Sequence, residues 1–268
     1  MSDRIDFGVL VLAHGTAITP YNIVQAGKCL VKSIRTYTKN NVPIAFVTHE
    51  AKWLEELSGD VDYIVEFPFG DAGFDDKNTQ KNLYQLWYAT PFERNLVVSL
   101  DSVCLQDLET IGDALNGHDI VFPRTSKTYN NNPLNNTGLV DLYNKMNLPR
   151  VLTDFWYFEK SKTQDFFDLL DVYSKNYSQI RTELGDFCPY EYNIDIVISL
   201  ALDILNLAES SDDIGILEYT DMKHLGKDWQ KRVNNWVKPK QIKVENFVLN
   251  GLVHLGRETN FRVIADEF

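Results

Sequence analysis

The first quarter of the chain alternates short apolar runs with helical segments, and this alternation restricts the fold more than any other feature. Residues 5–12 (IDFGVLVL), 42–48 (VPIAFVT) and 61–67 (VDYIVEF) are dense in aliphatic side chains and predict buried strands. Between them, residues 20–37 repeat apolar side chains every three or four positions, and residues 51–57 predict a shorter helix. Strands joined through helices need crossover connections, so the pattern predicts an α/β fold with a mostly parallel sheet flanked by helices.

The rest of the chain extends this pattern without a linker or an internal repeat. The further predicted segments are strands at 95–100 and 151–158, helices at 77–88, 161–173 and 194–207, and a polar, asparagine-rich loop at 126–136. With 44% hydrophobic residues in 268, one domain can bury a large core. We therefore expect a single domain over residues 1–268.

Composition and charge narrow the range of functions. The chain carries 38 acidic and 26 basic residues, a formal net charge of -12, which on average repels polyanions. No apolar run reaches the roughly 18 residues that a membrane span needs, and the N-terminus has no signal-peptide pattern, so we expect a cytoplasmic protein. The three cysteines have no CxxC spacing, which argues against a zinc cluster and a disulfide framework.

One segment departs from the acidic average. Residues 227–243 collect six basic side chains around Trp229 and Trp236. Basic and aromatic residues together can form a nucleic acid-binding surface, so this segment is a candidate contact with DNA. A solvated basic face is the alternative.

The stretch NLVVSLDS, residues 95–102, predicts a buried strand that ends in Asp101 and Ser102. Ligands of α/β proteins bind beyond the carboxyl ends of the strands, so a charge at this tip faces a site. A metal-binding tip usually carries a second acid two positions on, but Val103 stands there, and Asp107 is placed to cap the next helix. The alternative role of Asp101 is to cap a turn.

The loop after the first strand, Ala13, His14, Gly15 and Thr16, has small residues that let a ligand approach the backbone. It contains neither GxGxxG nor GxxxxGK, and the chain has no GxSxG, so the sequence does not favour dinucleotide binding, a P-loop or a nucleophile elbow. His14 could equally be a loop histidine without a ligand.

The motifs LAHGT, ATPFERNLVVSLDS and NLPRVLTDFWYFEKSKTQDFF together resemble the GT-A-type glycosyltransferases of tailed phages, which are distantly related to the glycogenin-like family 8 glycosyltransferases. The resemblance covers most of residues 5–208. It implies a GT-A domain with a nucleotide-binding half at 5–110 and a sugar and acceptor half at 111–268. It further implies a nucleoside diphosphate sugar as donor, a UDP-sugar above all, a divalent metal (Mn or Mg), and the host cytoplasm for a phage protein.

The resemblance also assigns roles to residues. It places the nucleotide against Ala13, His14, Gly15, Thr16, Asp101 and Ser102, the metal on Asp101 and His254, and the acceptor beside Asp195 in YNIDIVISLAL. His224 in KHLGKDW is the other histidine that resembles the metal ligand of the family. Asp195 could instead favour the dipole of its helix, and His254 could be a core histidine. Because Val103 breaks the LDxD motif, Asp101 uses another ligand, or no metal binds, or activity has been lost.

The sequence thus predicts a glycosyltransferase, a hexosyl- or pentosyltransferase, with hydroxymethylated phage DNA as one candidate acceptor. The alternative is a degenerate, non-catalytic protein that binds a nucleotide-sugar or a glycan. A nucleotidyltransferase is less well supported, because the first loop lacks the glycine-rich, basic phosphate loop that its chemistry prefers.

Overall fold

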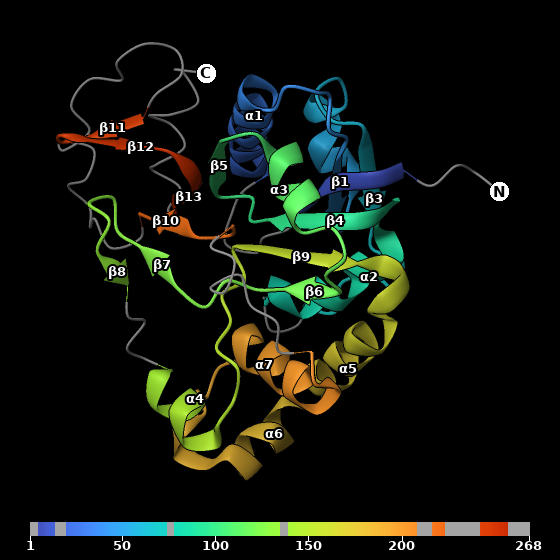
Figure 1. Ribbon diagram of the computed structural model, residues 1–268. Helices are drawn as coiled ribbons and strands as arrows, with labels where there is room; N and C mark the ends of the chain where they lie inside the picture. Colours follow the sequence, from blue (N-terminus) through green and yellow to red (C-terminus); the bar gives the residue numbers. More distant parts are fainter. Residues whose placement is uncertain are drawn as a thin grey trace.

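The fold is organised around a central six-stranded sheet in the order β3-β2-β1-β4-β9-β6 (Figure 1). The computed structural model describes residues 5–13, 20–73, 78–134, 139–207, 216–222 and 242–256. The strands of this sheet are β1 (Ile5–Leu12), β2 (Ile44–Thr48), β3 (Tyr63–Glu66), β4 (Phe92–Val98), β6 (Ile120–Val121) and β9 (Phe155–Glu159). Strands β1 to β4 pair in parallel, whereas β9 runs antiparallel to β4 and to β6. The predicted α/β fold with a mostly parallel sheet is confirmed.

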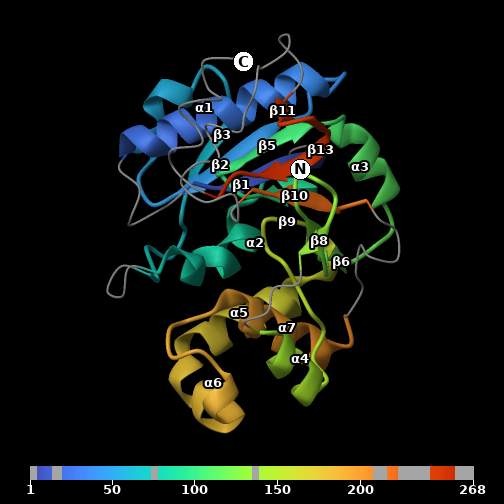
Figure 2. The same ribbon diagram turned by 90° about the vertical axis from the view of Figure 1, so that its left-hand side faces the viewer.

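Helices cover both faces of the central sheet, which explains why its strands are apolar on both sides. Figure 1 shows α1 on one side and α5 and α7 on the other, and Figure 2 shows α4 grouped with α5, α6 and α7. The helices are α1 (Pro20–Tyr37), α2 (Leu86–Ala89), α3 (Leu108–Ala114), α4 (Val140–Met146), α5 (Gln164–Lys175), α6 (Tyr177–Leu184) and α7 (Ile194–Leu205). Short 3₁₀ helices are η1 (Ala51–Leu57), η2 (Thr79–Gln85), η3 (Lys160–Lys162) and η4 (Gly185–Phe187). Among the described residues, no helix is both long and apolar enough to cross a membrane.

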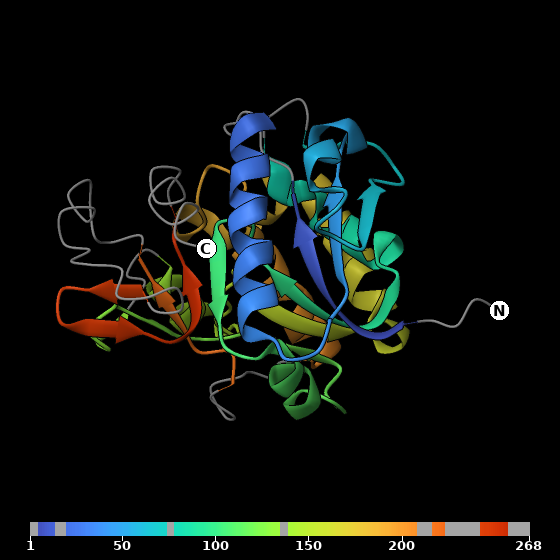
Figure 3. The same cartoon turned by 90° about the horizontal axis from the view of Figure 1, so that it is seen from above.

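A second sheet of five short strands lies beside the central one, in the order β5-β13-β10-β7-β8. Its strands are β5 (Ser102–Leu105), β7 (Ser126–Lys127), β8 (Pro133–Leu134), β10 (Tyr219–Asp221) and β13 (Gly251–His254), and β11 (Ile242–Val244) forms a separate hairpin with β12 (Phe247–Leu249). Seen from above, β5 runs alongside α1 (Figure 3). The antiparallel pairing of β5 with β13 brings His254 opposite Ser102, although 152 positions separate them.

Several local predictions are corrected by this second sheet. The strand predicted at 95–100 ends at Val98, and after a turn the chain enters β5 at Ser102. The segment predicted as a loop at 126–136 contains β7 and β8. Strands β5 and β7 pair with the distant strands β13 and β10, and β8 is a strand of two residues that pairs with β7, so local sequence patterns do not reveal them.

Three predicted helices differ from the structure in their start or type, whereas the predicted helix cap at Asp107 is confirmed. The helix expected from Ser161 begins as α5 at Gln164, after the 3₁₀ turn η3, and the segments predicted as helices at 51–57 and 77–88 are largely 3₁₀. Asp107 does cap α3, since its Oδ1 accepts a hydrogen bond from Glu109 N at 3.1 Å. All three cysteines are free and buried.

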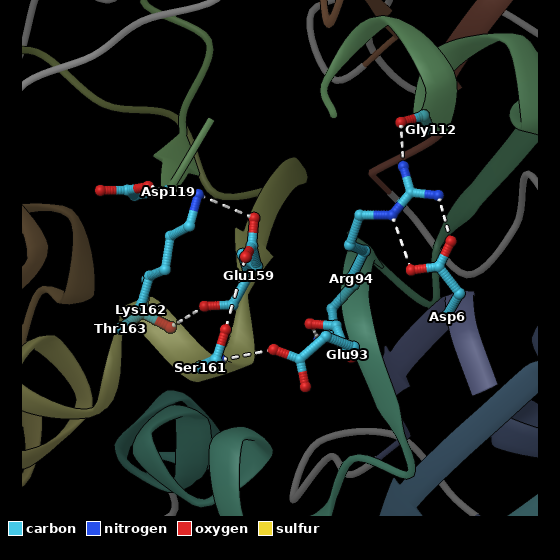
Figure 4. Close-up of polar contacts among 10 residues, drawn as sticks. Asp6, Glu93, Arg94, Gly112, Asp119, Glu159, Ser161, Lys162 and Thr163 are labelled. Atoms are coloured by element: carbon cyan, nitrogen blue, oxygen red, sulfur yellow. Dashed lines mark hydrogen bonds and ion pairs between the residues drawn. The ribbon is translucent and has the colours of Figure 1, made fainter. Parts of the chain in front are cut away.

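Arg94 of β4 joins three elements at the edge opposite the strand ends (Figure 4). Its guanidinium donates to both carboxylate oxygens of Asp6 in β1, at 3.1 and 2.7 Å, and to the carbonyl of Gly112 in α3 at 2.9 Å. This hydrogen bonding lowers the pKa of Asp6. The Arg94 side chain is only 11% exposed and also lies over the Phe7 ring. Lys162 makes a comparable pair of contacts, to Asp119 at 3.0 Å and Glu159 at 3.1 Å, but is 38% exposed.

We expect Arg94→Ala to lower the free energy of unfolding by about 1–3 kcal/mol, because it removes buried packing and leaves the Gly112 carbonyl without its donor. The matched variant Lys162→Ala should cost less than about 1 kcal/mol, because exposed ion pairs are weakly stabilising. Urea unfolding of both variants and the parent measures the difference. An equal loss of unfolding free energy in the two variants would show that Arg94 does not stabilise the fold more than Lys162 does.

Candidate active site

Two adjoining pockets open at the carboxyl ends of the parallel strands. The first, here called the strand-end pocket, is lined by Leu12 of β1, Val98 of β4 and Asp101, with Asn22 and Ala26 of α1. The second, here called the Asp195 pocket, measures about 530 Å³ and is lined among others by Asp195, Tyr219 and Asp221. Gln80, Thr153 and Asp154 line both pockets. The two pockets therefore meet at Asp154.

The position of these pockets follows from the strand order. Strand β1 pairs with β2 on one side and with β4 on the other, so the strand order reverses its direction at β1. Such a topological switch leaves a crevice beyond the carboxyl ends of the neighbouring strands, and this is where α/β proteins bind ligands. The strand-end pocket lies at this crevice.

A buried histidine surrounded by three carboxylates stands at the junction of the pockets. His254 Nε2 lies 3.0 Å from Asp101 Oδ2 and 3.4 Å from Asp154 Oδ1, and its Nδ1 lies 3.3 Å from Asp221 Oδ1. We call these four residues the Asp–His quartet. The His254 side chain is 3% exposed, whereas Asp101, Asp154 and Asp221 are 29%, 24% and 12% exposed. The carboxylates thus remain reachable from the pockets while the ring does not.

Backbone pairing explains how the quartet assembles. Asp101 occupies the turn between β4 and β5, where its carbonyl accepts from Leu255 N at 2.8 Å and its carboxylate accepts from the Ser99 hydroxyl. Asp154 precedes β9, and its carbonyl accepts from Ser99 N at 2.8 Å. Asp221 is the register partner of His254 in the parallel pair β10 and β13. Both sheets therefore contribute to the quartet.

The electrostatics of the quartet favour a charged imidazole. Burial opposes the charge, but the nearby carboxylates of Asp154 and Asp101, the hydrogen bond to Asp101 and the contact with Asp221 outweigh it and raise the pKa of His254 well above its usual value. Tyr219 donates a hydrogen bond to Asp154 Oδ2 at 2.6 Å. Burial and the charge of Asp154 raise the pKa of Tyr219 well above its usual value, so its hydroxyl stays a donor.

Asp195 lies in the first turn of α7, and the helix is capped by its neighbour. The Asn193 side chain accepts a hydrogen bond from Ile196 N at 3.2 Å and is the N-cap. The Asp195 carboxylate lines its pocket and accepts from the Thr153 hydroxyl at 3.1 Å. Asp195 therefore lies at the helix end that favours a negative charge and also lines the pocket, so the two roles do not exclude each other.

The chemistry of the quartet fits a divalent cation. Carboxylate oxygens suit Mn²⁺ or Mg²⁺, an imidazole nitrogen favours a transition-metal ion such as Mn²⁺ over Mg²⁺, and a carboxylate on the second ring nitrogen is the usual support of a metal-binding histidine. Three carboxylates also exceed one imidazolium by two formal charges. In the part of the chain that the structure describes, no three His, Cys, Asp or Glu side chains are already spaced to hold an ion. In the quartet, the ring nitrogens of His254 contact the carboxylates directly.

The other residues predicted from the sequence are placed as follows. Ala13 is buried, and its N–H donates to the Val47 carbonyl at 2.8 Å. Ser102 is fully buried, and its hydroxyl has no hydrogen-bond partner among the described residues. Val103 is fully buried in the core, so an acid at this position would not reach the pockets. The predicted residues His14, Gly15, Thr16 and His224 and the basic residues 227–241 lie outside the described residues.

Asp154 and Asp221 are members of the site that the sequence analysis missed. Asp154 directly precedes β9, and only the antiparallel direction of that strand, which the sequence does not reveal, places its start at the edge where the parallel neighbours end. Asp221 ends a strand of three residues, which is too short to show a periodic pattern.

Comparisons with known proteins identify the fold. No protein-family model matches the chain, and no curated protein matches its sequence. Among solved structures, it resembles the galactosyltransferase LgtC in complex with donor and acceptor sugar analogs, at a TM-score of 0.53 and 9% identity over 97% of this chain and 96% of that one. It also resembles mouse xyloside xylosyltransferase 1, at a TM-score of 0.51 and 10% identity over 93% and 97%. The glycosyltransferase GlyE of Streptococcus pneumoniae matches at 0.52 and 10% identity over 98% of this chain and 63% of its own. The predicted GT-A fold is confirmed.

We expect the His254 imidazolium to make stability depend on pH. Its folded-state pKa is raised, so its contribution is full below the unfolded value of about 6.5 and is lost as the pH rises through the folded value. The free energy of unfolding of the parent should therefore fall relative to that of His254→Asn as the pH increases above about 6.5. Urea unfolding at a series of pH values, in chelator-treated buffer, measures this difference. A difference that stays constant with pH would contradict the assignment.

Proposed function

We propose that the chain is a glycosyltransferase that moves a sugar from a nucleoside diphosphate donor, a UDP-sugar, to an acceptor hydroxyl. The observation that carries this proposal is the pair of acidic pockets at the topological switch point of the sheet, in a fold shared with glycosyltransferases. We assign the nucleotide to the strand-end pocket and the acceptor to the Asp195 pocket, because Asp154 of the quartet lines both.

The donor would lie in the strand-end pocket. The predicted donor residues Ala13 to Thr16 follow β1 in the sequence, and Asp101 lines this pocket at the strand ends, where α/β proteins bind nucleotides. Its diphosphate would then approach Asp101 and Asp154, whose negative charge repels it. A divalent cation held by Asp101 and His254 would offset this repulsion and neutralise the charge on the leaving diphosphate.

The acceptor would enter the Asp195 pocket. A carboxylate accepts hydrogen bonds from sugar hydroxyl groups, and one near the reacting oxygen can also take its proton. The Asp195 carboxylate is held by Thr153, which is the neighbour of Asp154 in the chain. This arrangement supports a role for Asp195 in orienting or activating the acceptor.

A second candidate is a degenerate protein that binds donor without turnover. It is favoured by one observation: the position of the second acid is taken by Val103, which is buried in the core. Prolonged incubation with a UDP-sugar distinguishes the two, since a transferase slowly hydrolyses its donor in the absence of acceptor, whereas a binding protein releases no free sugar.

We expect nucleoside diphosphates and Mn²⁺ together to raise the melting temperature. A ligand at a hundredfold its dissociation constant adds about 2.7 kcal/mol, which is a shift of several degrees. Thermal melting with a panel of nucleoside diphosphates and their sugars, with and without Mn²⁺, measures it. Asp101→Ala should lose the shift.

The matched control for this experiment is Asp107→Ala, which removes an acid six positions away that only caps α3. It should melt somewhat lower than the parent and keep the ligand-induced shift. No shift with any nucleotide in the parent, or an undiminished shift in Asp101→Ala, would count against the proposed donor site.

For the acceptor we propose hydroxymethylated DNA bases, reached through the basic residues 227–243. We expect the protein to be retained on DNA and released by added salt, because basic contacts with phosphates weaken steeply as salt rises. Replacing Lys231, Arg232 and Lys238 together by Glu should abolish retention, whereas Lys39→Glu should not. Retention that survives the triple replacement would refute this acceptor.

A further inference from the structure

The acid that the LDxD-like motif lacks has a spatial counterpart elsewhere in the fold. Position 103 points into the core, so the chain cannot complete a site through that residue. Asp154 instead approaches the site from the start of β9, and it lines both pockets. It is thus available to a ligand bound in either pocket.

Asp101 and Asp154 converge on a single nitrogen. His254 Nε2 lies 3.0 Å from an oxygen of Asp101 and 3.4 Å from an oxygen of Asp154. Adjacent ligand atoms around an octahedral ion with bonds of about 2.1 Å are roughly 3 Å apart. One oxygen of each aspartate therefore lies from Nε2 at about the spacing of neighbouring ligands, to within a few tenths of an ångström.

The remaining atoms of these side chains are held by the surrounding structure. Tyr219 donates to Asp154 Oδ2 at 2.6 Å, which leaves Oδ1 directed at His254. Asp221 contacts Nδ1 of His254 and so orients the ring with Nε2 toward Asp101 and Asp154. Outer partners of this kind fix the orientation of metal ligands, and a carboxylate on the second ring nitrogen raises the basicity of the histidine.

Charge and polarity point to a cation at the same place. The quartet carries an excess of negative charge even with a protonated ring, and none of the described residues lining the two pockets is Lys or Arg. Ser102 adds a fully buried hydroxyl without a hydrogen-bond partner in the described part of the chain. As the register partner of His254 in adjacent antiparallel strands, it projects on the same face of the sheet.

We infer that Asp154 replaces the missing second acid of the motif and, together with Asp101 and His254, forms a binding site for one divalent cation of the Mn²⁺ or Mg²⁺ class. Asp221 is a positioning residue that acts through His254. This inference rests on the proposed function, because the ion would serve the diphosphate of the donor.

The test is a titration of Mn²⁺ followed by electron paramagnetic resonance, in which free Mn²⁺ is counted directly, with and without UDP. The parent should bind one Mn²⁺, and Asp154→Asn should weaken binding at least tenfold, as should Asp101→Asn. Asp154→Asn keeps an oxygen that can accept the Tyr219 hydrogen bond, so it removes charge with little change in shape. Asp195→Asn removes a carboxylate that lines the same pocket as Asp154 and does not belong to the quartet, and should bind within about twofold of the parent.

A second variant separates ligation from a structural role. Asp154→Cys should reverse the preference of the site, because a thiolate favours a soft ion such as Cd²⁺ over Mn²⁺. Ultraviolet absorption of the thiolate bound to Cd²⁺ reports this in the variant, with the parent as control for its three buried cysteines. A folded Asp154→Cys protein with no such absorption would overturn the assignment of Asp154.

The outcomes also separate this inference from the proposed function. If Asp154→Asn binds Mn²⁺ like the parent while Asp101→Asn does not, Asp154 is not a ligand, and the proposed donor site stands. If the parent binds UDP but no Mn²⁺ under any condition, the cation site is refuted and the donor site again stands. If it binds neither, both proposals fail.

Discussion

The burial of one histidine among three carboxylates is the constraint on which the rest of the site depends. Asp101 and Asp154 come from the end of β4 and the start of β9 in the central sheet, and Asp221 and His254 end two strands of the second sheet. Charges taken out of water are tolerated only when they are paired, so the two sheets must meet at this point with their strand ends in register. The position of the second sheet is thus tied to the quartet.

This junction also decides where ligands can bind. The parallel strands create a crevice at the switch point beside β1, and the second sheet closes part of it with the quartet. What remains is one pocket on each side of Asp154, with an acid available to each. A donor and an acceptor in these pockets would be presented to the same group of charges, which is the arrangement that transfer between two bound molecules requires.

Much of this was predictable, and the failures share a cause. The helical and strand periodicities of the first 67 residues predicted the parallel sheet, and the strand-tip rule located Asp101. The resemblance to known transferases pointed to His254 and Asp195. Asp154 was passed over because the direction of β9 was unknown, and Asp221 because β10 has only three residues. Short strands carry weak local signals, since their stability comes from partners far away in the sequence.

The sequence by itself determined the class of fold, the core strands, the cap at Asp107 and the absence of a second acid at Val103, because each depends on neighbours along the chain. Only the tertiary structure decided that Val103 faces the core, that Asp154 lies beside Asp101 and His254, and that three carboxylates surround His254. These facts depend on which strands pair and in which direction, and such pairing brings together residues that are up to 153 positions apart. A local sequence pattern covers only neighbouring residues, so it cannot show which distant strands will pair.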